Sequence, residues 1–399
     1  MVIEPQPVIP KAAAAYLKRC LPPQPQAKWE QVLAVLRTAP AAMTVHPGAT
    51  LAAVARTALG LWLLRVVYID GRVDPAPLLD PVRFPDSDQL RGHLFDQLIP
   101  ALVTTRSPSA DPADPFRPRH RHDPVQTRRW LAYLARTMTR PPDGSAPTRD
   151  IAWWRLAQGT RMFTATIRFA SGLALGLVFG LVFGLVFGLV FGLMVGLVFG
   201  LMGGSWLLEE PGLTNLRLHG RVSQLAGGLA FGLAGGLVFG LAFGLVSGIV
   251  GGLVFGLVLG LAFGLAFGLV VGLITWVEVP SGAERATAPM TSWRADRALN
   301  LVRTATFMLM GGLVFGLAFG LVGGSADGLA VGLVSGNHHA WLAYLVATYR
   351  LAWAGRLPRA LMPFLDDAHR LGLLRAVGPI YQFRHADLQD HLAADSSPN

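Results

Sequence analysis

Apolar residues and glycine are distributed very unevenly along this chain of 399 residues. They fill three blocks, 171–208, 225–276 and 305–336, and the only charge in these blocks is Asp327. Most of the Arg, Asp, Glu and Pro residues lie outside 171–336. Each block is longer than the ~20 residues that a bilayer-spanning helix needs. The pattern therefore predicts a soluble part, a membrane part and a second soluble part.

The first block contains a four-residue repeat, GLVFGLVFGLVFGLVFG, at 176–192. In an α-helix a spacing of four residues advances each glycine by about 40° around the axis, so the glycines form one slowly winding groove. Small residues four apart allow the close backbone approach on which helix association in lipid depends. A β-barrel would need a polar lumen, and the repeat has no polar alternation. We expect helix packing and self-association through Gly176, Gly180, Gly184, Gly188, Gly232, Gly236, Gly240, Gly256, Gly260, Gly264, Gly312, Gly316 and Gly320.

The lengths of the blocks bear on the number of membrane crossings. A single helix over the first block would be roughly 54 Å long, which exceeds the ~30 Å hydrocarbon core. Three hairpins, and so six crossings, fit better, and four crossings with long tilted outer helices are the alternative. Either even number places both termini in the cytoplasm of a multi-pass plasma-membrane protein. Six crossings also satisfy the positive-inside rule, because nine arginines near the blocks then lie on the same side of the membrane. They are Arg161, Arg168, Arg217, Arg221, Arg294, Arg297, Arg303, Arg350 and Arg356.

The N-terminal flank, 1–105, is predicted to be a helical domain. Apolar residues recur at spacings of three and four in the segments 14–21, 28–37, 50–68 and 87–103. The third segment is membrane-like at ALGLWLL, but Arg56 and Arg65 bracket only eight residues, so a buried core helix is expected.

Segment 106–160 is predicted to hold a linker and juxtamembrane helices. It begins with the proline- and charge-rich stretch 106–124. His120 and His122 in this stretch could bind a metal or an anion, but Asp123 is the only carboxylate at ligand spacing, so we expect a solvated linker and no metal site. Trp153 and Trp154 precede the first block and are expected to be interfacial anchors.

The formal net charge of +10 comes almost entirely from arginine. Basic residues beside apolar spans follow from the positive-inside bias, so the charge indicates a lipid bilayer rather than nucleic acid as the partner. The single cysteine, Cys20, excludes a disulfide within the chain.

The C-terminal flank, 338–399, returns to globular patterning. Helices are expected at 340–353, 361–374 and 384–394, with two short strands within 374–383. Helix, helix, hairpin, helix is the outline of a winged-helix-like domain. The aspartates Asp366, Asp367, Asp387 and Asp390 argue against DNA binding by this domain. The fold class is therefore mainly α, with a helical domain, a polytopic membrane region of glycine-zipper hairpins at 161–337 and a small winged-helix-like domain.

Residues 357–393 resemble the C-terminal end of actinobacterial NACHT-type (STAND) NTPases. The motif residues are Phe383, His385 and Gln389. In these proteins a nucleotide domain, a helical domain and a winged helix form a switch, and some members carry glycine-rich membrane blocks. The N-terminal flank is similar to their helical domain. The resemblance implies that His385 contacts a nucleotide phosphate, and that Ala58 stands where a proline commonly touches the adenine.

The chain departs from this family in lacking the phosphate-binding loop. No G-x-x-x-x-G-K-[ST] motif is present, because none of the three lysines, Lys11, Lys18 and Lys28, follows a glycine. We therefore expect no cofactor and no enzymatic activity in this chain, unless a P-loop domain is encoded upstream. The leading hypothesis is a membrane-anchored, non-catalytic portion of a NACHT-like signalling switch, which acts by tethering and helix assembly together with a separate nucleotide-binding domain.

Two alternatives remain open. One is an oligomeric channel or transporter-like bundle, in which Asp327, His338 and His339 would lie at one mouth. The other is a membrane-tethered transcriptional regulator, which depends on the winged-helix outline alone.

Overall fold

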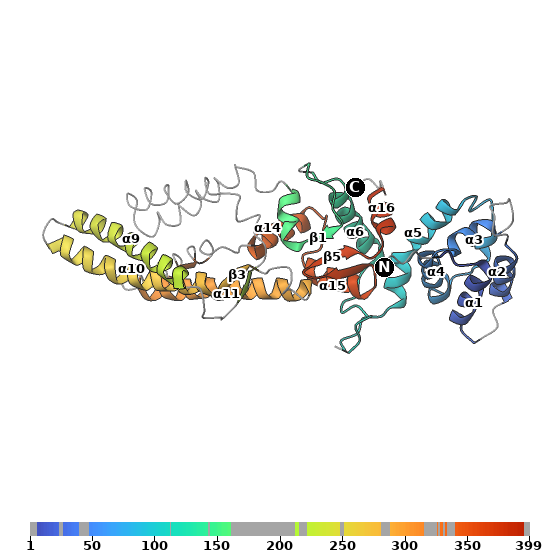
Figure 1. Ribbon diagram of the computed structural model, residues 1–399, viewed down its shortest axis with the longest axis horizontal. Coiled ribbons are helices and arrows are strands. Elements are labelled where there is room, and N and C mark those ends of the chain that lie inside the picture. The colour runs from blue at the N-terminus through green and yellow to red at the C-terminus, as the bar shows by residue number, and fades with distance from the viewer. Residues whose placement is uncertain are drawn as a thin grey trace.

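The computed structural model describes most of both flanks and part of the apolar region. The described residues are 6–23, 27–39, 48–111, 113–142, 144–160, 212–214, 222–247, 251–280, 288–314, 325, 328–329, 332 and 340–394. They are mainly helical and form an elongated molecule with the N-terminal helices at one end and two long apolar helices at the other (Figure 1).

The N-terminal flank is helical, as predicted. Its elements are α1 (Pro10–Cys20), α2 (Ala27–Thr38), α3 (Ala49–Ala55), α4 (Ala58–Leu64), the π-helix η1 (Arg65–Asp70), the short 3₁₀ helix η2 (Ala76–Leu79) and α5 (Ser87–Thr105). Leu17, Leu36, Leu51, Leu64 and Leu98 are fully buried between them. Each long helix has one apolar face, as Leu90, Leu94 and Leu98 show on α5 by their spacing of four residues, and these faces meet in one core.

The segment 50–68 was expected to be one core helix, and it is two. The helices Ala49–Ala55 and Ala58–Asp70 meet at an angle of 113°. Thr57 lies at the N-cap of α4, where its Oγ1 accepts a hydrogen bond of 3.0 Å from the N–H of Gly60. A Cβ on Gly60 would lie 2.0 Å from the carbonyl oxygen of Val54, so glycine is required at this bend. Both helices belong to the core, as expected, because Val54, Leu63 and Leu64 are buried.

Among the helices built from described residues, none alone combines the length and the hydropathy that a bilayer crossing requires. The bent pair Ala49–Ala55 and Ala58–Asp70 has the required length and hydropathy only when its two helices are counted as one. The expected crossings within 171–208 lie outside the described residues.

The C-terminal flank has the predicted order of helix, helix, hairpin and helix. The elements are α14 (Ala340–Trp353), α15 (Leu361–Arg370), β4 (Leu374–Val377), β5 (Ile380–Phe383) and α16 (Ala386–Ala394). The two strands pair antiparallel, with Leu374 opposite Phe383. Tyr381 and Phe383 of β5 and Leu388 of α16 are buried in the same core.

The segment 106–160 contains helices after its linker, as predicted, together with a short strand that was not predicted. It contains α6 (Pro124–Thr139), β1 (Asp150–Ile151) and the 3₁₀ helix η3 (Trp153–Thr160). Strand β1 pairs with β5, with Ile151 opposite Tyr381, and the sheet order is β1-β5-β4. Trp153 and Trp154 are buried rather than interfacial, and the ring of Trp153 lies edge-on to Tyr344 at 5.8 Å. The C-terminal unit is therefore assembled from residues on both sides of the apolar region.

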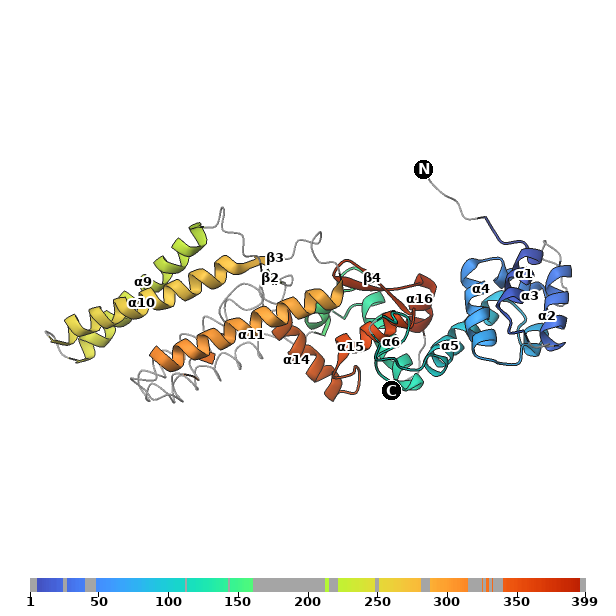
Figure 2. The ribbon, with the colours of Figure 1, turned by 90° about the horizontal axis from the view of Figure 1, so that it is seen from below.

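Three long helices extend away from this unit. They are α9 (Val222–Ser247), α10 (Gly251–Val277) and α11 (Pro289–Val314). Helices α9 and α10 lie side by side in both views (Figures 1 and 2). The short strands β2 (Gly212–Thr214) and β3 (Glu278–Pro280) pair antiparallel, and β3 follows directly after α10.

Candidate functional site

The glycines of α9 and α10 face each other. Five from each helix are buried between the two: Gly228, Gly232, Gly236, Gly240 and Gly244 from α9, and Gly256, Gly260, Gly264, Gly268 and Gly272 from α10. A Cβ on Gly236 would lie 2.1 Å from the carbonyl oxygen of Gly260, and a Cβ on Gly232 would lie 2.3 Å from that of Gly264. The two backbones are therefore in direct contact along the hairpin.

The proposed packing positions divide into three groups. Gly232, Gly236, Gly240, Gly256, Gly260 and Gly264 lie in this contact. Gly312, near the end of α11, is also buried, and a Cβ there would lie 2.8 Å from the Oγ of Ser325. The others are outside the described residues: Gly176, Gly180, Gly184, Gly188, Gly316 and Gly320.

The outer surface of the hairpin carries large apolar side chains. Val238 on α9 is 67% exposed and Val254 on α10 is 66% exposed. Phe231, Val258 and Leu265 are also exposed. A hairpin in water buries its large apolar groups, whereas this one buries glycine and presents Leu, Val and Phe outward. Such a surface needs an apolar partner.

A buried polar cluster lies on the first half of α11, between the hairpin and the C-terminal unit. Asp296, Asn300 and Arg303 are buried at successive turns of one helix face. An Nη of Arg303 donates to Oδ1 of Asn300 at 2.7 Å, and Nε donates to the carbonyl oxygen of Gly332 at 3.3 Å. Asp296 Oδ2 accepts from the backbone N–H of Trp341 at 2.8 Å. The cluster thus fixes the start of α14 to α11.

The motif residue His385 lies at the contact between the N-terminal and C-terminal units. Its ring is 5.3 Å from that of Trp62 on α4. Phe383 and Gln389, the other motif residues, are buried. Gln389 donates through Nε2 to the carbonyl oxygen of Thr148 at 3.3 Å, which fixes α16 to the segment before β1. Ala58 begins α4, one turn before Trp62.

Burial lowers the pKa of His385, and the nearby Arg384 and Arg375 act in the same direction, against Asp387. The unfolded chain has an ordinary histidine pKa of about 6.5 and so binds protons more readily below that pH than the folded chain does. We expect stability to fall as the pH decreases from about 6.5 through the lower pKa of folded His385. The variant His385→Gln lacks the titrating group and so lacks this pH dependence of stability. Between pH 7.5 and pH 5 the midpoint of thermal unfolding should therefore fall less for the variant than for the wild type. An equal fall in the two proteins would contradict the prediction.

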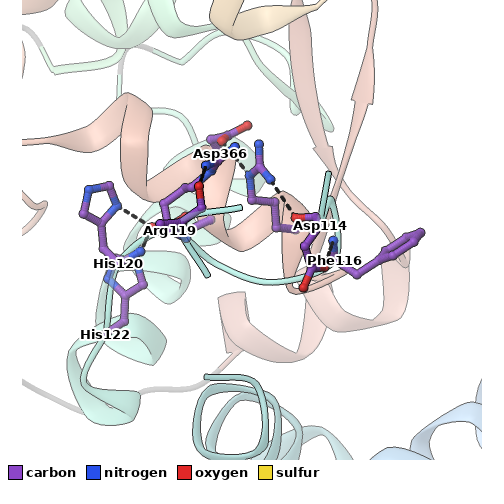
Figure 3. A network of polar contacts seen from close by, with 9 residues as sticks. Asp114, Phe116, Arg119, His120, His122 and Asp366 are labelled. Carbon is purple, nitrogen blue, oxygen red and sulfur yellow. Dashed lines mark hydrogen bonds and ion pairs between the residues drawn. The ribbon is translucent and has the colours of Figure 1, made fainter. Parts of the chain in front are cut away.

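A second cluster joins the loop before α6 to α15. Asp367 on α15 is fully buried. Its Oδ2 lies 2.9 Å from Nδ1 of His120 and 2.8 Å from Nε2 of His122. The backbone N–H of Arg119 donates to Oδ1 at 2.6 Å, and that of His120 donates to Oδ2 at 3.2 Å. Figure 3 shows the two imidazoles side by side on the loop. His122 is also edge-on to the ring of Phe364 at 5.5 Å.

Burial alone would raise the pKa of Asp367, but hydrogen bonds from His122, the backbone of Arg119 and His120 lower it below its ordinary value. The carboxylate is therefore charged at neutral pH. The expectation of a solvated linker is wrong for this pair of histidines, because both contact a buried carboxylate. Asp123, the carboxylate considered from the sequence, instead caps α6 by accepting from the N–H of Gln126 at 2.8 Å.

Comparisons with family models, with curated proteins and with solved structures find no match to this chain. The interpretation of its function therefore depends on the geometry described above.

Proposed function

We propose that this chain is the membrane-anchored, non-catalytic portion of a NACHT-like signalling switch. The observation that carries the proposal is the inverted hairpin of α9 and α10, with glycine inside and Leu, Val and Phe outside. Helices of 26 and 27 residues are about 39 and 40 Å long, which matches a ~30 Å hydrocarbon core in length, while the apolar stretches described within them, Leu225–Val238 and Gly256–Gly272, are shorter. Close glycine contact supplies the van der Waals packing on which helices in lipid depend.

The pairing of β1 with β5 supports an even number of crossings. Ile151 precedes the apolar region and Tyr381 follows it, and the two residues are neighbours in one sheet. The chain must therefore leave and re-enter this unit on the same side of a bilayer. Both soluble flanks would then share the cytoplasmic side, as the arginine distribution requires.

The contact of Trp62 with His385 supports a switch role for the soluble flanks. This contact joins the N-terminal helical flank to the C-terminal flank. Its C-terminal residue, His385, is the one that the family resemblance expects to contact a nucleotide phosphate. We infer that a separate nucleotide-binding domain would dock near this contact and alter it. The chain would then transmit that change to membrane helices, which anchor the assembly and associate with further copies.

The test is the sidedness of the hairpin. In a Cys20→Ala background, cysteines are introduced singly as Ser247→Cys, at the end of α9 next to the turn, and Ser223→Cys, at its start. A membrane-impermeant thiol reagent applied to intact cells should label the first and not the second. Lysed cells control for reactivity, since both sites should label there. Labelling of Ser223→Cys from outside, or of neither site, would contradict the proposed topology.

A further inference from the structure

The strongest unexplained chemistry in the soluble part is the cluster of His120, His122 and Asp367. Their nearest ligand atoms, two imidazole nitrogens and one carboxylate oxygen, all lie within 4.8 Å of one another. Zinc binds such nitrogen and oxygen ligands at about 2.0 to 2.2 Å, which places tetrahedral ligands about 3.3 Å apart. The two N···O distances of 2.9 and 2.8 Å need only a small opening to reach that separation.

Oδ2 of Asp367 has more nitrogen neighbours than the two lone pairs of one carboxylate oxygen can serve. Three nitrogens lie within hydrogen-bond distance of this one oxygen: the backbone nitrogen of His120, its Nδ1, and Nε2 of His122. Each imidazole must carry its proton on the nitrogen that faces the carboxylate to avoid repulsion. One divalent cation between the three side chains would replace both protons and neutralise the buried carboxylate.

The surroundings have the features of a metal site with an open position. The side chain of His120 is 62% exposed, which provides an entry path. The two histidines line an open hollow of about 710 Å³ together with Arg121, Asp123 and Leu371. The backbone N–H groups of Arg119 and His120 orient the carboxylate, as outer-shell donors do in metal proteins. Three protein ligands and a solvent-facing side leave room for a water as the fourth ligand.

We propose that His120, His122 and Asp367 bind a divalent transition metal ion, with zinc as the preferred ion, and that the ion locks the loop 106–123 onto α15. Other contacts already tie this loop to the end of α15. Arg106 donates to the carbonyl oxygen of Leu371 at 3.2 Å. Arg370 donates at 3.3 Å to the carbonyl oxygen of Asp114, which is labelled in Figure 3. Because the loop joins α5 to α6, the ion would set how rigidly the N-terminal unit is held against the C-terminal one.

The test uses the full chain in detergent, purified with a tag that contains no histidine. Zinc chloride is titrated in a calorimeter, and the wild type is expected to bind one ion that His120→Ala and His122→Ala bind at least tenfold more weakly, since loss of an outer-shell partner alone costs about 10- to 100-fold. The midpoint of thermal unfolding should rise with zinc in the wild type only. His120→Ala is the decisive variant, because its exposed side chain can be removed without opening the core.

The matched control is His391→Ala, which removes a histidine that pairs with a single carboxylate, Asp96, at 2.8 Å. Its zinc affinity should equal that of the wild type. Cobalt(II) provides a second readout, since a tetrahedral site gives strong visible absorption that His120→Ala should abolish. If the wild type binds no zinc, or if His120→Ala and the wild type bind it equally, the three residues are a hydrogen-bonded clamp and the metal site is excluded.

Discussion

Asp296→Ala is expected to lower the free energy of unfolding by about 1.5 to 3 kcal/mol, the usual contribution of a hydrogen bond to a charged group. The substitution leaves the backbone N–H of Trp341 without its carboxylate acceptor. It also removes the oxygen to which the side-chain amide of the buried Asn300 donates at 3.3 Å. Chemical unfolding in detergent, followed by circular dichroism, would measure the loss.

Two further variants separate charge from hydrogen bonding. Asp296→Asn retains an oxygen that can accept from Trp341 and should show a smaller loss than alanine does. Asp88→Ala removes an exposed aspartate from the first turn of α5, where the expected cost is below about 1 kcal/mol. A loss in Asp296→Ala no greater than that in Asp88→Ala would mean that the α11 cluster does not stabilise the fold.

Gly236→Ala is expected to destabilise the α9–α10 hairpin by about 1 to 3 kcal/mol, the usual cost of inserting an extra carbon into a close-packed contact. The new methyl group would start 2.1 Å from the carbonyl oxygen of Gly260, and no flexible side chain is there to move aside. The helices must separate or slide to accommodate it. Titration with a denaturing detergent, again followed by circular dichroism, would report the loss.

The neighbouring glycine supplies a control of identical chemistry. A Cβ on Gly235 would meet no atom within 4 Å, so Gly235→Ala should keep the packing and gain up to about 1 kcal/mol in helix propensity. Equal effects of the two substitutions would show that the glycines do not hold the helices together, and the inverted hairpin would lose its support as a membrane anchor.

Local sequence patterns predicted much of the helical content correctly. The spacing of apolar residues predicted α1, α2 and α5, and turn residues around Gly378 predicted the β4–β5 hairpin. The bend at Thr57 was missed because apolar periodicity continues on both sides of it. The signal that could have revealed it is the pair Thr57 and Gly60, a helix cap followed by a glycine that permits close packing.

The remaining features depend on contacts between distant parts of the chain. Asp367 lies 245 positions from His122, so no spacing rule could join them. Strand β1 has only two residues, too few to show an alternating pattern, and exists because β5 supplies its partner. Trp153 and Trp154 were expected in a membrane interface because of their position near an apolar block, yet the later α14 covers Trp153.

The divided construction of the C-terminal unit determines when the protein can finish folding during synthesis. Asp150 and its partner Gln382 are 232 positions apart. A ribosome adds ~5–20 residues per second, so β1 and α6 wait roughly 12 to 46 s for β5 and α16 to be made. The apolar helices α9 and α10 are synthesised within this interval. Until translation ends, the apolar face of α6 lacks its cover from α16 and is open to chaperones, and a chain that stops before Ile380 would leave β1 without its partner strand.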